Sequence, residues 1–531
     1  MGSAASARGG CAPIIRPLQT TLPPVVRLRG PGPGALLLLA VALAWTSSCR
    51  SAPAAGADAP ILRIGLGVGP TARTTGLAVW TQLLHAEGLL TRGWDGRATQ
   101  RLASSWRWED EGHTLRLTLK PDVRLHDGAL LDADLVVRLL RQRALAPPEE
   151  RQFGFAYVTD VTSPDPSTIL VRLSQPNIFL LTEIVDSYVV HPDKPDVGTG
   201  PFQIISREPD VELRRFSQYH GGLSSLGGIK FLTYDTHRSA WAALMRGEVD
   251  AVLEVNRESV EFMQRSSGVR TYSALQPFYV SMVFNQRHPA LRNVEVRRAL
   301  SMALDRRAIV ERAMHGRGRV ADVPIWPFHW AYAGSESAVI HDPAMAGAQL
   351  DRAGFPLPAA GPQGQMRKRF TFRCLVYSED PLYERIALMV QRQLFDIGVE
   401  VVIELAGMDT FGRRAGSGDF DAFLISANAS KSLEFTYRFW HSGLPAPLKM
   451  QNSGYSGADA VLDQLRRSTS DDDTRAAVAS LARTFHDDAP AAFIAWLEIT
   501  RAVNARWSVG DDNVQDPFAN IWHWRMSGER P

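Results

Sequence analysis

The sequence predicts an α/β protein with at least two lobes. Its 531 residues exceed what one hydrophobic core usually serves. Strand-like and helix-like segments alternate along the chain. One example is the helix expected over Thr236–Gly247, which Gly247–Asp250 closes before a strand. Helix–strand units of this kind are typical of α/β lobes. The composition, 45% hydrophobic and 21% charged, is that of an ordinary globular protein.

The charge balance argues against a nucleic-acid-binding function. There are 58 Lys and Arg residues and 56 Asp and Glu residues, which leaves a formal net charge of +2. Nucleic-acid-binding domains instead concentrate positive charge on one face. We therefore expect no nucleic-acid partner.

The N-terminus has the pattern of an export signal. Arginines precede an apolar run from Ala35 to Trp45, which is too short for a standard membrane span but suits a signal peptide. The segment Thr46–Cys49 that follows resembles a bacterial lipoprotein cleavage site, although Leu is usual where Thr46 stands. We expect residues 1–48 to be a signal peptide, Cys49 to be lipidated and 49–60 to be a flexible tether. Plain secretion by cleavage near Ser48 is the alternative, and a true start downstream of Met1 stays open.

The first elements after the leader are a strand, a glycine-rich loop and a helix. Ile61–Val68 reads as the strand and Gly76–Gly88 as the helix. Gly65–Gly69 is similar to a dinucleotide fingerprint, but its spacing is wrong and Pro70 follows. We interpret these glycines as a close-packed strand end.

A strand, turn and helix follow. Leu115, Leu117 and Leu119 alternate with polar residues, His126–Gly128 is a turn, and Asp132 is expected to cap a helix. His126 is interpreted as a turn-stabilising hydrogen-bonding residue rather than a metal ligand or catalytic group. A hairpin is expected over 158–177, turning at Ser163–Pro166.

The stretch Gly198-Thr199-Gly200-Pro201-Phe202 is a tight turn that leads into a strand. Glycine tolerates positive φ and proline fixes φ, so such a turn lets the backbone pass close to another segment. Tyr219–Gly222 follows it.

The second half predicts further strands and capped helices. Gln276–Asn285 is a strand, Asn293 caps 294–303, Asp305 caps the next helix, and Gly316 ends it. The later elements expected are a buried strand at 370–376 containing Cys374, a helix at 383–397, strands at 399–405 and 420–426, a helix at 458–467 capped by Ser456, and a helix at 474–488.

Nothing in the chain has the spacing of a catalytic or metal motif. Walker, zincin, triad and kinase patterns are missing from the sequence, and the His positions do not match metal-ligand spacing. We expect no enzyme activity, no cofactor and no metal site.

Five blocks of the chain, named at the end of this paragraph in their sequence order, together resemble the bacterial extracellular solute-binding proteins of the peptide/nickel type. Those proteins are the capture subunits of ATP-driven importers. One departure is Leu135, where these proteins usually carry an acidic residue. The blocks are the strand–His126-Asp127-Gly128–helix unit, Gly198–Phe202 with Tyr219–Gly222, the helix followed by Gly247–Asp250, the helix pair Val296–Val310, and Asp488–Trp496.

The resemblance implies a two-lobe periplasmic-binding-protein clamshell (type II-like), α/β in class, with an extra α+β subdomain in the first lobe. Lobe one is expected at 61–88, 190–274 and 488–531, the extra subdomain at 89–189, and lobe two at 275–487. The protein is then a monomer of the periplasm or cell envelope that captures a solute between its lobes and presents it to the membrane subunits of an ATP-binding-cassette importer. A sensor or chaperone on the same scaffold is the alternative, and an enzyme is a weaker one.

Candidate ligand-contacting residues come from loops that the resemblance places at the cleft. Core filling is the competing interpretation for every aromatic among them. The candidates are Thr71, Arg73, Tyr279, Trp326, Phe328, His329, Trp330, Tyr332, Asn428 and Lys431.

One departure from the family bears on the ligand. Peptide-binding members carry an Asp after the strand matched here by 420–426, and that Asp pairs with the peptide's ammonium. The segment Ser426–Glu434 has no Asp, and the position falls near Ser430 or Lys431. A Lys431 that points into the cleft would favour a carboxylate or phosphate over an ammonium. A Lys431 in solvent, or Glu434 in place of the Asp, are the alternatives, and the sequence does not name the ligand.

Overall fold

The computed structural model describes residues 59–67, 72–147, 151–334, 340–359, 367–445, 448–510 and 516–528. The chain divides into two units, Met1–Ala57 and Asp58–Pro531, and every described residue belongs to the second. The signal-peptide and Cys49 predictions therefore lie outside the described residues. Within these ranges no helix has the length and apolar character needed to span a bilayer.

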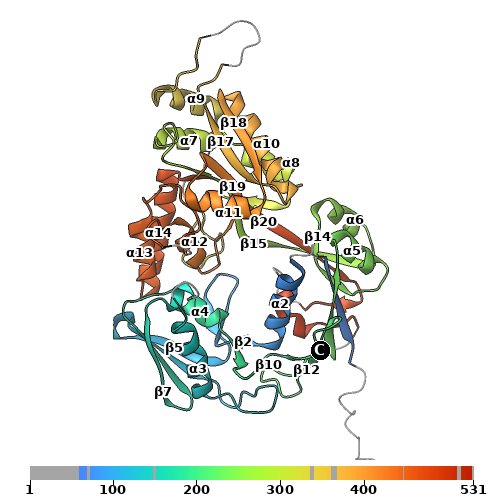
Figure 1. Cartoon of the computed structure of the whole chain (residues 1–531). Coiled ribbons are helices and arrows are strands. Elements are labelled where there is room, and N and C mark those ends of the chain that lie inside the picture. The colour runs from blue at the N-terminus through green and yellow to red at the C-terminus, as the bar shows by residue number, and fades with distance from the viewer. Residues whose placement is uncertain are drawn as a thin grey trace, which may run out of the picture. The chain divides into compact units, whose positions relative to one another are not determined.

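One large mixed sheet runs through this unit (Figure 1). Within the described residues it has 11 strands, in the order β11-β12-β13-β1-β14-β20-β15-β19-β17-β18, with β16 also paired to β20. Their bounds are β11 Phe202–Ser206, β12 Val211–Arg215, β13 Gly228–Tyr234, β1 Ile61–Gly67, β14 Ala251–Val255, β20 Ala491–Asn504, β15 Val269–Phe284, β19 Ala422–Asn428, β17 Phe370–Tyr377, β18 Val399–Ala406 and β16 Gly318–Val320.

Two long antiparallel strands, β15 and β20, connect the two halves of the sheet (Figure 1). The C-terminal end of β20 pairs with β14, whereas the C-terminal end of β15 pairs with β19. Their mutual register shifts between Leu275 and Tyr279. Pro277 lies in this interval and has no N–H to donate to the ladder, which accounts for a local break in pairing.

Helices cover the half of the sheet that contains β1. β1 runs parallel to β13 and β14, as expected for helix-connected strands. Thr236 and Ser239 form the capping box that starts α5, and Asp250 is fully buried and paired with Arg63 and Arg506. The helices of this half are α2 Ala72–His85, α5 His237–Met245, the short 3-10 helix η4 Arg257–Ser259 and α6 Val260–Gln264.

Residues between β2 and β10 form a separate hydrophobic cluster of their own around a four-stranded sheet. Asp132 caps α3 by accepting a hydrogen bond from the Leu135 amide, as predicted. The elements are β2 Glu87–Gly88, β3 Leu90–Arg92, β4 Ala98–Gln100, β5 Ala103–Glu109, η2 Asp110–Gly112, β6 Thr114–Leu119, α3 Ala133–Ala144, η3 Phe153–Phe155, β7 Val158–Asp165, β8 Thr168–Leu173, α4 Leu180–Asp186, β9 Tyr188–His191 and β10 Lys194–Gly198.

The hairpin of this region turns later than predicted. β7 continues through Ser163 to Asp165, so the turn lies at Pro166 and Ser167. Asp165 Oδ1 accepts hydrogen bonds from the amides of Ser167 and Thr168, and this local carboxylate–amide contact fixes the turn.

The other half of the sheet carries two large hydrophobic clusters. Asn293 and Asp305 cap α7 and α8 as predicted, each through its side-chain oxygen. Cys374 on β17 is a buried thiol, and burial raises its pKa, so it is unreactive there. The helices of this half are α7 Val294–Met302, α8 Arg306–Ala313, α9 Pro343–Arg352, α10 Pro381–Asp396, α11 Met408–Ser417, α12 Glu434–Trp440, α13 Asp459–Arg466 and α14 Asp471–Asp488. The last elements of the chain, which pack with the β1 half, are β21 Trp507–Ser508, η5 Pro517–His523 and β22 Arg525–Met526.

The predicted cap at Ser456 is wrong. The N-cap of α13 is Ala458, which makes no side-chain cap, and Ser456 contributes only its carbonyl to the Asp459 amide. The helix starts later because Ala458 is fully buried against the core and Tyr455 is tied to Asp488 by its hydroxyl.

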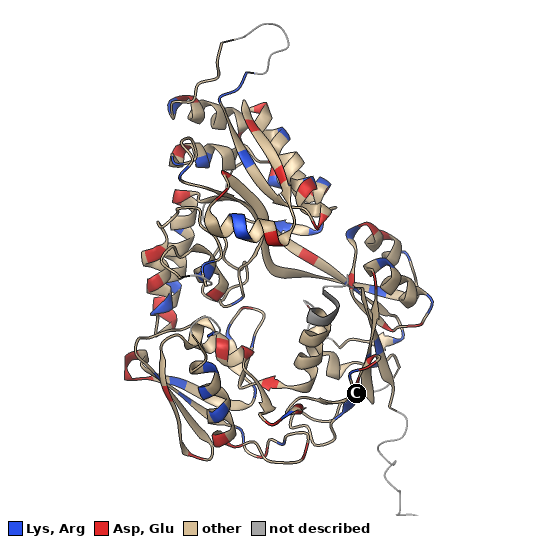
Figure 2. Cartoon of the chain, in the orientation of Figure 1, with Lys and Arg blue, Asp and Glu red and all other residues tan. Residues whose placement is uncertain are grey.

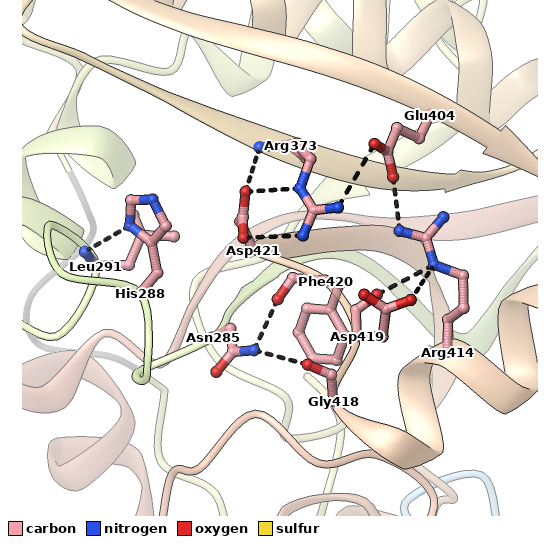
Figure 3. Close-up of polar contacts among 10 residues, drawn as sticks. All are labelled: Asn285, His288, Leu291, Arg373, Glu404, Arg414, Gly418, Asp419, Phe420 and Asp421. Atoms are coloured by element: carbon pink, nitrogen blue, oxygen red, sulfur yellow. Dashed lines mark hydrogen bonds and ion pairs between the residues drawn. The ribbon is translucent and has the colours of Figure 1, made fainter.

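Polar contacts fix the start of β19 (Figure 3). Asp421 accepts hydrogen bonds from the backbone and side chain of Arg373 on β17. Arg414 on α11 donates to Glu404 on β18, and the Asn285 side chain donates to two carbonyls of the chain just before Asp421. These contacts therefore fix the register of β19 in the sheet, and the register in turn fixes where the loop that begins at residue 429 leaves the sheet.

His126 stabilises the Gly198–Pro201 turn rather than serving as a metal ligand or catalyst. Its Nε2 donates to the Gly200 carbonyl at 2.9 Å, and its Nδ1 accepts from the Gly198 amide at 3.3 Å. Burial lowers the pKa of His126, which favours the neutral ring that these two bonds require.

The two glycines of that turn are explained by close packing rather than by positive φ. A Cβ on Gly198 would lie 2.1 Å from the His85 carbonyl oxygen, and one on Gly200 would lie 2.5 Å from that of Leu84. Gly67 is close-packed in the same way, because its Cβ would lie 2.3 Å from the His237 Cα. This agrees with interpreting that strand end as packed rather than nucleotide-binding.

Candidate ligand-binding site

Two of the predicted aromatic contacts are core residues. Tyr279 and Trp326 are both fully buried. The Tyr279 hydroxyl accepts a hydrogen bond from the Trp440 indole at 3.0 Å, and its ring packs edge-on against Phe493 and Trp496. Tyr279 therefore presents no surface to a solute in this structure. Thr71 and the side chain of Arg73 lie outside the described residues.

The aromatic loop 324–332 packs against the turn between β3 and β4. The Trp326 indole donates to the Trp94 carbonyl at 2.9 Å, and the two rings meet edge to face at 5.3 Å. The Trp330 amide donates to the Asp95 carbonyl at 3.0 Å. Phe328 is 41% exposed, with its ring 5.8 Å from that of Trp94. Of the predicted aromatics, Phe328 is the most accessible to a solute.

The remaining loop residues have mixed surroundings. His329 is buried, and burial lowers its pKa to about 4, so it stays neutral at physiological pH. The Trp330 ring holds the guanidinium of Arg97 at 3.9 Å and that of Arg475 at 5.4 Å. Burial raises the pKa of the half-buried Tyr332 to about 12. His329 and Tyr332 therefore do not change protonation state near neutral pH, and the Trp330 indole is not a titratable group.

Lys431 lies against the same turn. Its Nζ is 4.1 Å from the centre of the Trp94 ring and 5.8 Å from that of Trp326. Burial lowers the pKa of Lys431 to about 8, with Arg92 acting in the same direction and Asp516 opposing it. An ammonium on an aromatic face is attracted to the ring, and the attraction strengthens when water is excluded. Lys431 thus points toward Trp94 and not into open solvent.

The loop that carries Lys431 is shaped by its neighbours. Asn428 Oδ1 accepts a hydrogen bond from the Ser430 amide at 2.8 Å, so Asn428 serves the turn. Ser430 and Leu433 both have positive φ, at 50° and 65°. Thr436 donates to the carbonyls of Ala429 and Pro324, each at 3.0 Å. This hydroxyl joins the Lys431 loop to the aromatic loop.

Glu434 pairs within its own helix. It is buried and lies 3.4 Å from Arg438 on its own helix, α12. Burial raises its pKa. Glu183 on α4 has its pKa raised to about 7, first by burial and then by the charge of Glu434. The Glu434 carboxylate therefore belongs to an acidic contact between α12 and α4.

A cavity of about 470 Å³ lies beside Trp94. Drug-sized solutes occupy pockets of roughly 300–1,000 Å³, so the volume suits a small polar solute. The cavity lies among the end of α2, β2, β3 and η5, and its lining includes Glu87, Arg92, Trp94, Arg101, Asp516 and Trp522.

The acidic residues of this cavity are engaged within the protein. Glu87 is 2.5 Å from Arg101, and it accepts from the Tyr219 hydroxyl at 2.8 Å and contacts His220 at 2.8 Å. The Tyr219–Gly222 motif of the sequence therefore holds a buried carboxylate in place.

Sequence reasoning missed Trp94, around which these contacts gather. The signal was the run Gly93-Trp94-Asp95-Gly96, a large aromatic in a glycine-flanked turn. Gly96 has φ +86°, and a Cβ there would lie 1.8 Å from the Lys431 carbonyl oxygen. The two backbones touch, and this contact is not visible in the sequence pattern.

The described residues contain no group of three or more His, Cys, Asp or Glu side chains placed to hold a metal ion. Acidic and basic residues are interspersed over the described elements (Figure 2). The side chains described here can hold a polar solute by hydrogen bonds, charge and stacking.

The chain is similar to known solute-binding proteins in both family-model and sequence comparisons. The model of the bacterial extracellular solute-binding proteins, family 5 (middle), matches residues 97–444. The probable D,D-dipeptide-binding periplasmic protein DdpA of Escherichia coli is 25% identical over 391 residues, which cover 69% of this chain and 72% of that protein. The dipeptide-binding protein of Escherichia coli is 23% identical over 438 residues, 74% of this chain and 80% of its own length.

Solved structures share the fold. NikA from Brucella suis, in complex with Fe(III)-EDTA, has a TM-score of 0.75 at 18% identity and covers 88% of this chain and 100% of its own. The oligopeptide-binding protein AppA from Bacillus subtilis, in complex with a nonapeptide, has a TM-score of 0.67 at 20% identity, covering 88% and 98%. The described architecture is therefore that of the two-lobe periplasmic binding proteins.

We predict that Gly96→Ala lowers the free energy of unfolding by more than the strain of an alanine at positive φ would alone. The new Cβ meets the Lys431 carbonyl, so the two loops must separate, which we expect to cost about 1–3 kcal/mol. Gly128→Ala is the matched control, because Gly128 has φ +88° and nothing within 4 Å of its Cβ; it should lose only about 1 kcal/mol. Calorimetric unfolding of both variants measures the difference, and equal losses would show that the contact contributes nothing.

Proposed function

Because the chain belongs to the bacterial extracellular solute-binding proteins of family 5, we propose that it captures a small polar solute and delivers it to an ATP-binding-cassette importer. The observation that carries this proposal is the cavity beside Trp94, next to the place where loops 324–332 and 429–433 meet the β3–β4 turn. A solute there would contact segments far apart in the sequence at once.

We infer that the solute-binding residues include Arg92, Trp94, Phe328 and Lys431. Arg92 and Trp94 line the cavity, Phe328 is the exposed aromatic beside Trp94, and Lys431 lies on the Trp94 ring. Aromatic faces hold a solute's apolar parts, and a few polar groups fix its orientation.

We also propose that the two halves of the large sheet belong to lobes that close on the solute. We divide the chain into lobe one at 61–88, 190–274 and 488–531, its extra subdomain at 89–189, and lobe two at 275–487. One hydrophobic cluster within lobe one, another within the extra subdomain, and the connecting strands β15 and β20 support this division. Two connecting strands allow a hinge, and closure around a ligand is a known use of such hinges.

The similar proteins are named for, or hold, chemically different solutes. One is named for D,D-dipeptides, one structure holds a nonapeptide, and another holds Fe(III)-EDTA. A peptide-like or other small polar molecule is thus the proposed cargo of this chain.

We further propose that the protein is exported and anchored by lipid at Cys49, on the strength of the apolar run before it. Several acyl chains bury enough CH₂ groups, at about 0.8 kcal/mol each, for stable attachment. Cell fractionation of wild type and Cys49→Ala checks this: the wild type should stay with the membrane and the variant should become soluble. Equal solubility of both would leave plain secretion.

A thermal-shift screen against a library of peptides, amino acids, sugars and chelates tests the proposed function. A solute at about 100 times its Kd should stabilise the protein by about 2.7 kcal/mol, which for a chain of 531 residues corresponds to a Tm gain of about 2–3 °C. Arg92→Met should reduce the gain, because Arg92 lines the cavity. Arg392→Met is the control, since Arg392 lines a different hollow between α10 and β18. A library without a single stabilising member, or equal effects of both variants, would contradict the proposal.

A further inference from the structure

Two hydrogen-bond donors beside the cavity lack a partner. Among the residues that the structure describes, none forms a hydrogen bond or ion pair with the Lys431 ammonium, whose contacts are the rings of Trp94 and Trp326. The Trp94 Nε1 is buried and is likewise unpaired within the described part of the chain. An unpaired buried donor costs free energy, and an unpaired charge costs more.

The nearby acceptors do not compensate these donors. Glu87 is committed to Arg101, Tyr219 and His220. Asp516 lies 3.0 Å from Arg501. Arg92 pairs with Asp186 at 3.1 Å and leaves further N–H groups at the cavity wall. The two carboxylates of the cavity wall are therefore already paired, whereas Arg92 keeps N–H groups for a solute.

The two donors belong to one place. Trp94 lines the cavity, and the Lys431 ammonium lies on its ring. Arg92 and Asp516, which also line the cavity, both act electrostatically on Lys431. A negatively charged group that approached Trp94 would meet the positive charges of Lys431 and Arg92, and the opposing charge of Asp516 is paired with Arg501. An ammonium would meet two like charges.

This inference rests on the proposed function: we propose that the solute presents an oxyanion to Lys431 beside the Trp94 ring, with Arg92 as a further positive charge. A carboxylate or a phosphate suits these two cations, because each carries negative charge and offers several acceptor oxygens. A solute whose only charge is an ammonium is disfavoured at this position.

The test compares matched solutes on matched variants. N-acetyl-dialanine has a carboxylate without an ammonium, dialaninamide has the reverse, and glycerol phosphate supplies a phosphate. Titration calorimetry with these probes, and with every charged member that stabilises the protein in the library, is run on wild type, Lys431→Met and Lys431→Glu. Lys368→Met is the control, because Lys368 is an exposed lysine paired with Glu400.

We expect the binders to be anionic, with the carboxylate and phosphate arms showing which source of the oxyanion is preferred. Lys431→Met should weaken their binding about ten-fold or more, Lys431→Glu should weaken it further, and Lys368→Met should leave it unchanged. Binders that are cationic or uncharged, or anions that bind Lys431→Met as well as wild type, would overturn the inference. A library with no binder at all would instead fail the proposed function and remove the premise.

A pH series on wild type separates a direct role of Lys431 from a structural one. Lys431 faces Arg92, Asp516 and the two indole rings, and its pKa is about 8, so its charge is present at pH 7 and is lost as pH rises above 8. Anion affinity should fall over that range in wild type and stay flat in Lys431→Met. The same pH dependence in both proteins would show that another group holds the anion.

Discussion

The hydrogen bond from the Trp326 indole to the Trp94 carbonyl positions the whole candidate site. It joins the β3–β4 turn to the aromatic loop, and Thr436 joins that loop in turn to the segment carrying Lys431. Gly96 allows the turn to touch the Lys431 backbone. Three segments that lie far apart in the sequence thus meet at Trp94; its partner Trp326 is 232 positions away. The cavity lies beside Trp94.

The electrostatics of this contact distinguish it from an ordinary core. The partly buried Lys431 lies on aromatic faces, and the carboxylates of the cavity are engaged elsewhere. Cation–π attraction offsets part of the cost of removing water from the ammonium. Under our proposal, a solute with acceptor oxygens would remove the remaining cost on binding, and that difference would add to affinity and selectivity.

Local sequence patterns predicted most of the elements but not the site. Caps such as Asp132, Asn293 and Asp305 act within one helical turn, so their side chains and spacing were sufficient. Ser456 failed because packing of Ala458 moved the helix start. The hydrogen-bonding role of His126 was foreseen, but its partners, Gly198 and Gly200, are more than 70 residues away. Tyr279 and Trp326 could not be separated from Phe328 by sequence, because burial is decided by tertiary contacts.

Hydrogen–deuterium exchange with and without a stabilising solute tests the central claim most directly, because it reads every segment at once. If the solute binds beside Trp94, amide exchange should slow in peptides covering 91–97 and 429–433, with smaller changes in the hollow between α10 and β18. Protection confined to α10 and β18, with none at those two loops, would contradict the account.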